Sequence, residues 1–139
     1  MKTDATKTSK VSEISVEAAL ADSNARVWPE GHAEGRQGDV LITRLANDDP
    51  RLDSALMPTR VRRLDRVLAR GSRAAHVCTE AADVYECDDG LLIVARERWA
   101  LHHLDTDGQR HHPHVLPAGA YFSVQQVEVT PRGMVPVRD

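Results

Sequence analysis

Short apolar or β-branched stretches, separated by turn residues, follow one another along most of the chain after residue 38. Seven stretches have the length of strands: 38–45, 74–80, 83–87, 91–98, 99–104, 110–116 and 120–130. Asp89-Gly90 and Asp107-Gly108 stand between consecutive stretches, and Asp-Gly is a pair that tight hairpin turns favour. No long amphipathic helix separates the strands. We therefore predict an all-β domain, a small antiparallel barrel or sandwich in which the strands form a meander.

The first 37 residues have a different pattern. All three lysines of the chain lie in the first ten residues, and from this change in composition we predict a mobile tail over residues 1 to about 12. Ser15 is a candidate N-cap for a short helix over residues 15–22. Pro29 and three glycines then indicate an irregular connection. The predicted organisation is a tail and connection over 1–37 and a single β-domain over 38–139.

The composition narrows the class of protein. A chain of 139 residues buries enough surface to fold without disulfides, so Cys78 and Cys87 are expected as thiols or metal ligands. No apolar run approaches the length of a bilayer span, and the opening residues lack the apolar centre of a signal peptide. We therefore expect a cytoplasmic protein that does not associate with membranes. Phosphate-loop, HExxH, GxSxG and CxxC motifs are absent from the sequence, which argues against nucleotide-dependent and thiol-redox enzymes.

Histidines are concentrated in one part of the chain. Five of the seven lie within thirteen residues: His102, His103, His111, His112 and His114. If Asp107-Gly108 forms a two-residue turn, His103 faces His112, whereas a three-residue loop would place His102 opposite His112. Either register gives a cross-strand histidine pair with Cβ atoms about 5 Å apart, a spacing at which two imidazoles can bind one ion.

A second group of candidate ligands lies upstream. His76, Cys78 and Glu80 alternate along a predicted strand and therefore share one face. Together the two groups predict a transition-metal site formed by His76, Cys78, His102 or His103, and His112. Zinc is the first expectation for three imidazoles and a thiolate, with iron or nickel as alternatives. Four protein ligands would make the site structural, and three ligands plus water would make it catalytic, so the sequence leaves open whether the protein is an enzyme.

Other interpretations of the same residues compete with a metal site. The histidines can form a solvated or hydrogen-bonded surface patch, or act as acids and bases without a metal, and Cys78 can be a small core residue. In the last long strand, Gln126 and Glu128 are candidates for orienting a ligand imidazole from behind. The competing interpretation of these two residues is polar decoration of an edge strand.

The sequence resembles a set of short uncharacterised bacterial β-proteins with the pattern GDVLI, then GHxH, a histidine-containing hairpin and LPxGxYxVxxQxE. The matching residues are Gly38 to Ile42, Gly71, His76, His102 or His103, His112, Leu116, Pro117, Gly119, Tyr121, Val124, Gln126 and Glu128. Ala75 and Cys78 depart from the glycine and the second histidine of GHxH. A weaker resemblance is to cupins, whose first histidine motif is similar to residues 71–86 and whose Pro-x-Gly turn is similar to Pro117–Gly119. Both resemblances imply a site around His76 and neither implies a particular reaction.

Charge is also unevenly distributed. Residues 60–73 hold six arginines and one acid, and residues 80–89 hold five acids, in a chain of formal net charge −3. On a helix, Arg62, Arg66 and Arg70 would line one face and form a surface for anions or a partner. A strand would not give such a separate stripe of arginines. The acidic segment can neutralise the arginines within the fold or between copies.

These charges suggest a second function. Scarce aromatic residues and the negative net charge argue against nucleic-acid binding. The alternative to a metal protein is a non-catalytic assembly or partner-binding module, an accessory, regulatory or virion component. Such a module would use the Arg-rich and acidic segments to form a homo-oligomer or to bind a protein partner.

Overall fold

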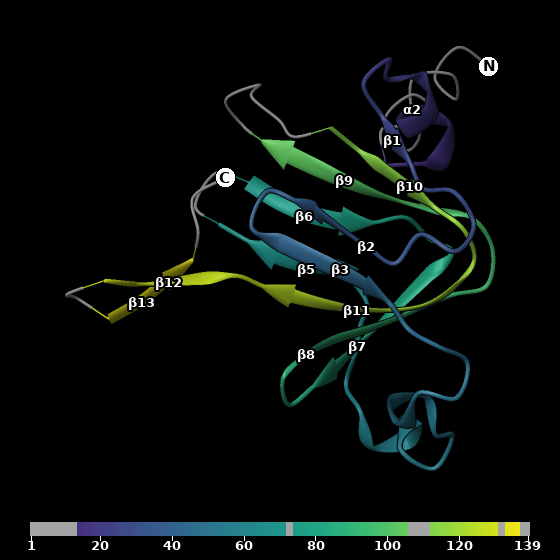
Figure 1. Cartoon of the computed structure of the whole chain (residues 1–139), viewed down its shortest axis with the longest axis vertical. Coiled ribbons are helices and arrows are strands. Elements are labelled where there is room, and N and C mark those ends of the chain that lie inside the picture. The colour runs from purple at the N-terminus through teal and green to yellow at the C-terminus, as the bar shows by residue number, and fades with distance from the viewer. Residues whose placement is uncertain (1–13, 72–73, 106–111, 131–132, 137–139) are drawn as a thin grey trace, which may run out of the picture.

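Two β-sheets packed face to face form the body of the protein in a computed structural model that describes residues 14–71, 74–105, 112–130 and 133–136 (Figure 1). The five-stranded sheet has the order β1 (Arg26–Val27), β10 (His114–Leu116), β9 (Trp99–Asp105), β6 (Ala74–Cys78) and β5 (Val67–Arg70). The six-stranded sheet has the order β2 (Glu34–Gln37), β3 (Val40–Arg44), β11 (Gly119–Gln125), β8 (Gly90–Ala95), β7 (Ala82–Cys87) and β4 (Arg62–Arg63). A hairpin of β12 (Val127–Thr130) and β13 (Gly133–Pro136) extends from the body.

The predicted all-β class is confirmed, and of the two predicted architectures the structure is the sandwich. Each sheet ends in edge strands, β1 and β5 in one and β2 and β4 in the other. Neighbouring strands are antiparallel except for the short parallel pair β1 and β10. The chain changes sheets after β1, β4, β6, β8 and β10, so from β5 onward consecutive hairpins alternate between the two layers and their order differs from a simple meander.

The core lies between the sheets and follows from the alternation of side chains along each strand. Inward-facing residues from both layers form one buried apolar cluster, which includes Ile42, Ile93, Trp99, Leu101 and Tyr121. Helix α2 (Val16–Ala21) covers the outer face of β9 and β10, where Ala19 packs against Ala100 and Val115. The 3-10 helices η1 (Pro50–Leu52) and η2 (Met57–Thr59) cover the outer face of the other sheet.

Several elements differ in extent from the sequence-based expectation. Strands β1 and β2 belong to the sandwich although they precede residue 38. Helix α2 begins where predicted, because the Ser15 hydroxyl accepts a hydrogen bond from the Ala18 N–H at 3.0 Å. The Arg-rich segment forms the short strands β4 and β5, so the helical stripe of Arg62, Arg66 and Arg70 is not formed. The predicted tail over residues 1–12 and the Asp107-Gly108 turn lie outside the described residues.

Candidate functional site

His76 and His103 lie side by side on the inner face of the five-stranded sheet. The register of β6 and β9 pairs them directly, and their ring centroids are 4.7 Å apart. Both side chains are buried, with relative exposures of 2% and 3%. Neither histidine is therefore a surface residue.

Asp39 reaches this pair from the opposite sheet. Gln37 pairs with Val40, which leaves Gly38 and Asp39 as the two turn residues between β2 and β3. Gly38 has a φ of 58°, and a glycine in the first turn position is typical of a tight type II′ hairpin. The turn directs the Asp39 carboxylate inward, where its Oδ1 lies 3.1 Å from His76 Nε2.

Two glutamine side chains contact Asp39 and His76 and hold them in place. The Gln125 amide donates a hydrogen bond to Asp39 Oδ2 at 2.6 Å. The Gln37 amide nitrogen donates to the backbone oxygens of Leu101 at 2.9 Å and His112 at 3.0 Å, while its Oε1 lies 2.8 Å from His76 Nδ1. Residues of both sheets therefore fix the position of the His76 ring.

Two imidazoles and a carboxylate are a combination that serves either metal binding or proton transfer. Two ligand atoms about 2.0–2.2 Å from a shared ion lie roughly 3 Å apart, which the contact between His76 and Asp39 matches. Within the described residues, no group of three or more His, Cys, Asp or Glu side chains already converges on a single ion position. A third ligand therefore requires a change in side-chain orientation.

Cys78 shares the inner face of β6 with His76, as strand parity predicted, but it lies in the apolar core. Its side chain belongs to the buried cluster between the sheets. Burial raises the pKa of the Cys78 thiol, and the nearby charge of Arg66 lowers it by a smaller amount. The thiolate form that would bind a metal is therefore disfavoured at this position.

His102 and His114 are buried against other partners. His102 is paired with Val77 and so faces away from His76, and its Nε2 lies 2.8 Å from the carbonyl oxygen of Ser15 at the start of α2. His114 Nδ1 accepts a hydrogen bond from Trp28 Nε1 at 3.0 Å. Both histidines therefore have structural partners.

His112 has an exposed side chain, and its backbone oxygen is held by Gln37. In the ladder between β9 and β10, His114 pairs with Leu101 and Val115 with Ala100. The same register, continued by two residues, would set His103 opposite His112, as the predicted two-residue turn requires. The turn itself and His111 lie outside the described residues.

The glutamine that donates a hydrogen bond to the Asp39 carboxylate is Gln125, not Gln126. The Gln126 side chain accepts a hydrogen bond from Arg36 at the surface, and the side chain of Glu128 lies outside what the structure describes. The alternation of the last long strand separates Gln125 from Gln126 by face, but the sequence gives no sign of which face is inside. Gln37 and Asp39 were also missed, although Gly38-Asp39 is recognisable as a turn signal.

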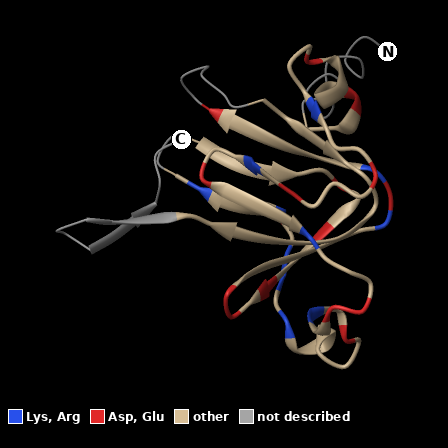
Figure 2. Cartoon of the chain, in the orientation of Figure 1, with Lys and Arg blue, Asp and Glu red and all other residues tan. Residues whose placement is uncertain are grey.

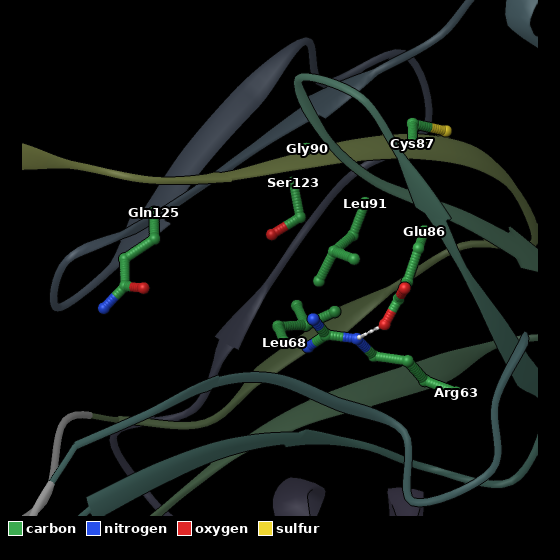
Figure 3. Close-up of a pocket in the computed structure, with 8 residues that line it drawn as sticks. All are labelled: Arg63, Leu68, Glu86, Cys87, Gly90, Leu91, Ser123 and Gln125. Atoms are coloured by element: carbon green, nitrogen blue, oxygen red, sulfur yellow. Dashed lines mark hydrogen bonds and ion pairs between the residues drawn. The ribbon is translucent and has the colours of Figure 1, made fainter. Parts of the chain in front are cut away.

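A pocket of about 290 Å³ adjoins the cluster through Gln125 (Figure 3). Leu68 and Leu91 form its apolar part, and Ser123 and Gln125 contribute polar groups from β11. At its edge, Arg63 Nε donates to Glu86 Oε2 at 3.1 Å. Ligands entering this pocket would meet one side of the Asp39 hydrogen-bond network.

The acidic segment neutralises part of the Arg-rich segment within the fold. Arg62 pairs with Asp83 at 2.9 Å and Arg63 with Glu86 at 3.1 Å, because β4 lies beside β7. Figure 2 shows acidic residues on the β7–β8 hairpin and basic residues along the neighbouring segment that leads into β5. Intramolecular pairing, one of the two expectations for these charges, is therefore present.

Comparison with known proteins does not assign this arrangement to a family. No protein-family model matches the chain, and neither a curated protein nor a solved structure shows significant similarity to it. Among the described residues, no helix is long and apolar enough to cross a membrane.

Proposed function

We propose that the protein binds a transition-metal ion between its two sheets, with His76, His103 and Asp39 as ligands. The observation that carries the proposal is the buried contact of 3.1 Å between His76 Nε2 and Asp39 Oδ1, beside a second buried imidazole. Two histidines and one carboxylate suit zinc or iron(II), and nickel is a further candidate. Zinc is the first ion to test.

The proposed ligand set differs from the one expected from sequence. Asp39 takes the place of Cys78, because the thiol is buried in the apolar core whereas the carboxylate touches His76. His103 is chosen over His102 because it shares a face with His76. His103 must turn its ring toward the ion, and His112, exposed at the rim, is the candidate fourth ligand.

Three protein ligands would leave a coordination position for water or for a small molecule. Catalytic zinc sites use this arrangement, in which the ion acts as a Lewis acid or activates the bound water. The pocket beside Gln125 reaches the Asp39 hydrogen-bond network, but none of the three proposed ligands lines it, so the catalytic form needs an opening between the pocket and the ion. The alternation of hairpins between the two sheets supports a further proposal, that the domain is related to cupins.

Elemental analysis of the protein purified without added metal tests the proposal, followed by zinc titration of the metal-free chain. We expect about one equivalent of zinc to bind and to raise the melting temperature. Asp39→Asn should weaken zinc binding by at least tenfold. Asp83→Asn makes the same chemical change at the ion pair with Arg62 and should leave zinc binding unchanged. Less than about a tenth of an equivalent of any transition metal, with no thermal shift on adding zinc, iron(II) or nickel, would remove the proposal.

A second candidate function, a partner-binding module, is supported by two apolar side chains on the Arg-rich segment. Val61 and Leu64 are 62% and 76% exposed, and they line a surface groove with Arg62, Arg63 and Arg70. A protein surface that combines acidic and apolar side chains, on another copy or on a different protein, would complement this groove.

Light scattering at high protein concentration tests the self-association form of this alternative. We expect Leu64→Glu to dissociate any oligomer, whereas Leu20→Glu, at an exposed position on helix α2, should not. A wild-type chain that is strictly monomeric, with no partner recovered whose binding depends on Leu64, would count against the module.

A further inference from the structure

We propose that Gln37 is the positioning residue of the proposed metal site. Its amide oxygen accepts a hydrogen bond from His76 Nδ1, which fixes the ring so that Nε2 is the nitrogen that faces Asp39 and would bind the ion. The consequence for metal binding rests on the proposed function. The position of the proton is a property of the metal-free protein and can be tested by itself.

The argument begins with the orientation of the Gln37 amide. Its nitrogen lies 2.9 Å from the Leu101 carbonyl oxygen and 3.0 Å from that of His112. Carbonyl oxygens only accept hydrogen bonds, so the two N–H groups of the amide must face them. The opposite orientation would bring three acceptors together in a buried space.

The orientation of the amide then decides that Nδ1 of His76 carries a proton. With both N–H groups used, Gln37 presents only its oxygen to His76 Nδ1, at a distance of 2.8 Å. An amide oxygen cannot donate, so Nδ1 must carry the proton of this hydrogen bond. Gln37 is 1% exposed, and water therefore does not compete for these groups.

A fixed tautomer matters because an imidazole binds a metal through a nitrogen lone pair. Ligating histidines commonly donate their other ring N–H to a carbonyl or carboxylate, which fixes both the tautomer and the orientation of the ring. Here the partner is the last residue of β2 in the opposite sheet, two residues before Asp39. A single hairpin, β2 to β3, therefore supplies both the carboxylate ligand and the group that orients His76.

Gln37 also has a structural role that the test must separate from positioning. Its two N–H groups connect β2 to β9 and to the chain segment at His112, so any substitution can lower stability. Gln37→Met removes both the donors and the acceptor at nearly constant length. Gln37→Glu retains an acceptor for Nδ1 and removes the two donors. Gln126→Met is the matched control, because Gln126 contacts Arg36 and not the histidines.

Two-bond ¹H–¹⁵N NMR spectra of histidine-labelled, metal-free protein report which ring nitrogen carries the proton, with His76→Ala providing the assignment. We expect a proton held on Nδ1 in the wild type, in Gln37→Glu and in Gln126→Met, and loss of this fixed Nδ1 proton in Gln37→Met. Zinc titration of the same proteins should show binding weakened by about 10- to 100-fold in Gln37→Met and by a smaller factor in Gln37→Glu.

The outcomes distinguish this inference from the proposed function. A wild-type His76 without a proton on Nδ1, or a Gln37→Met protein that retains both the fixed Nδ1 proton and wild-type zinc affinity, would overturn the role of Gln37. A wild type that shows the Nδ1–H tautomer but binds no metal would overturn the metal site alone. If Gln37→Glu fails to fold, the spectrum of the wild type still decides the tautomer.

Discussion

The two faces of the five-stranded sheet carry buried histidines with different partners. On the inner face, His76 contacts Asp39 and Gln37, side chains supplied by the opposite sheet. On the outer face, His102 is nearly as buried, but its ring nitrogen meets the backbone oxygen of Ser15. Burial alone therefore does not mark the candidate site. The difference lies in the second ring and the carboxylate that lie next to His76 on the inner face.

This contrast shows how one strand serves two purposes. Along β9, Trp99, Leu101 and His103 face the core between the sheets, while Ala100 and His102 face helix α2. A hydrogen bond to a backbone carbonyl satisfies a buried histidine but adds no side chain that could serve with it as a metal ligand. A carboxylate and a second imidazole create a site where a cation would be stabilised.

The largest predicted difference between the faces is their response to zinc. At a zinc concentration 100 times Kd, a ligand that binds only the folded state adds about 2.7 kcal/mol to the free energy of unfolding. We expect this gain in the wild type and in His102→Ala, and its loss in His76→Ala, because the proposed ligands lie on the inner face. Urea denaturation with and without zinc measures it. Equal gains in both variants would show that the faces do not differ in this way.

In the metal-free protein, a substitution on the outer face should lower the free energy of unfolding. Replacing His102 with Ala removes the contact with Ser15 and leaves space under α2, which we expect to lower the free energy of unfolding by about 2 kcal/mol. His112→Ala, at an exposed side chain, should change it by less than about 0.5 kcal/mol. Chemical denaturation compares the two. Similar losses would mean that the buried contact of His102 contributes little.

Cys78 and His76 share the inner face, and the pH dependence of stability tests whether Cys78 is a neutral core thiol. Burial raises the pKa of Cys78 above its ordinary value of 9.0, so above that pH the unfolded chain loses the thiol proton while the folded chain keeps it. The folded state then binds more protons than the unfolded state, and stability falls as pH rises. We expect a loss of up to about 1.4 kcal/mol between about pH 9 and pH 10, where the raised pKa of Tyr121 adds little.

The matching measurement is the free energy of unfolding against pH for the wild type and Cys78→Ala. The variant is less stable at every pH, but its slope between about pH 9 and pH 10 should be smaller by the contribution of one thiol. An unchanged slope would show that Cys78 is not a buried neutral thiol. Cys78 would then return as a candidate metal ligand.

The smallest predicted effect concerns the turn that brings Asp39 to the inner face. Gly38 has a φ of 58°, a conformation that costs an alanine roughly 1 kcal/mol and an asparagine less. We expect Gly38→Ala to lower the free energy of unfolding by about that amount and to weaken zinc binding, because the strained turn shifts Asp39. Gly38→Asn should have smaller effects on both. Equal behaviour of the two variants would show that the turn does not require this conformation.

Much of the fold could be predicted from local patterns. Strands β3, β6, β7, β8, β9 and β11 coincide with apolar stretches of the sequence, because a strand in a sandwich buries alternate residues. Strand β2, with the sequence EGRQ, was not predicted, because it lies at a sheet edge and has little apolar surface to bury. Strand β4 consists of two arginines, and its pairing with β7 follows from backbone hydrogen bonds and ion pairs rather than from an apolar pattern.

For the candidate site, the sequence by itself determined that His76 shares a face with Cys78 and that His102 and His103 lie on opposite faces, because side chains alternate along a strand. Only the tertiary structure decided which of these faces points inward, and which groups meet His76 there. Gln37 is 39 positions away from His76 in the chain, and the two meet because the sheets pack against each other. That packing depends on burial of the whole apolar core, which no local pattern around Gly38-Asp39 or His76 encodes.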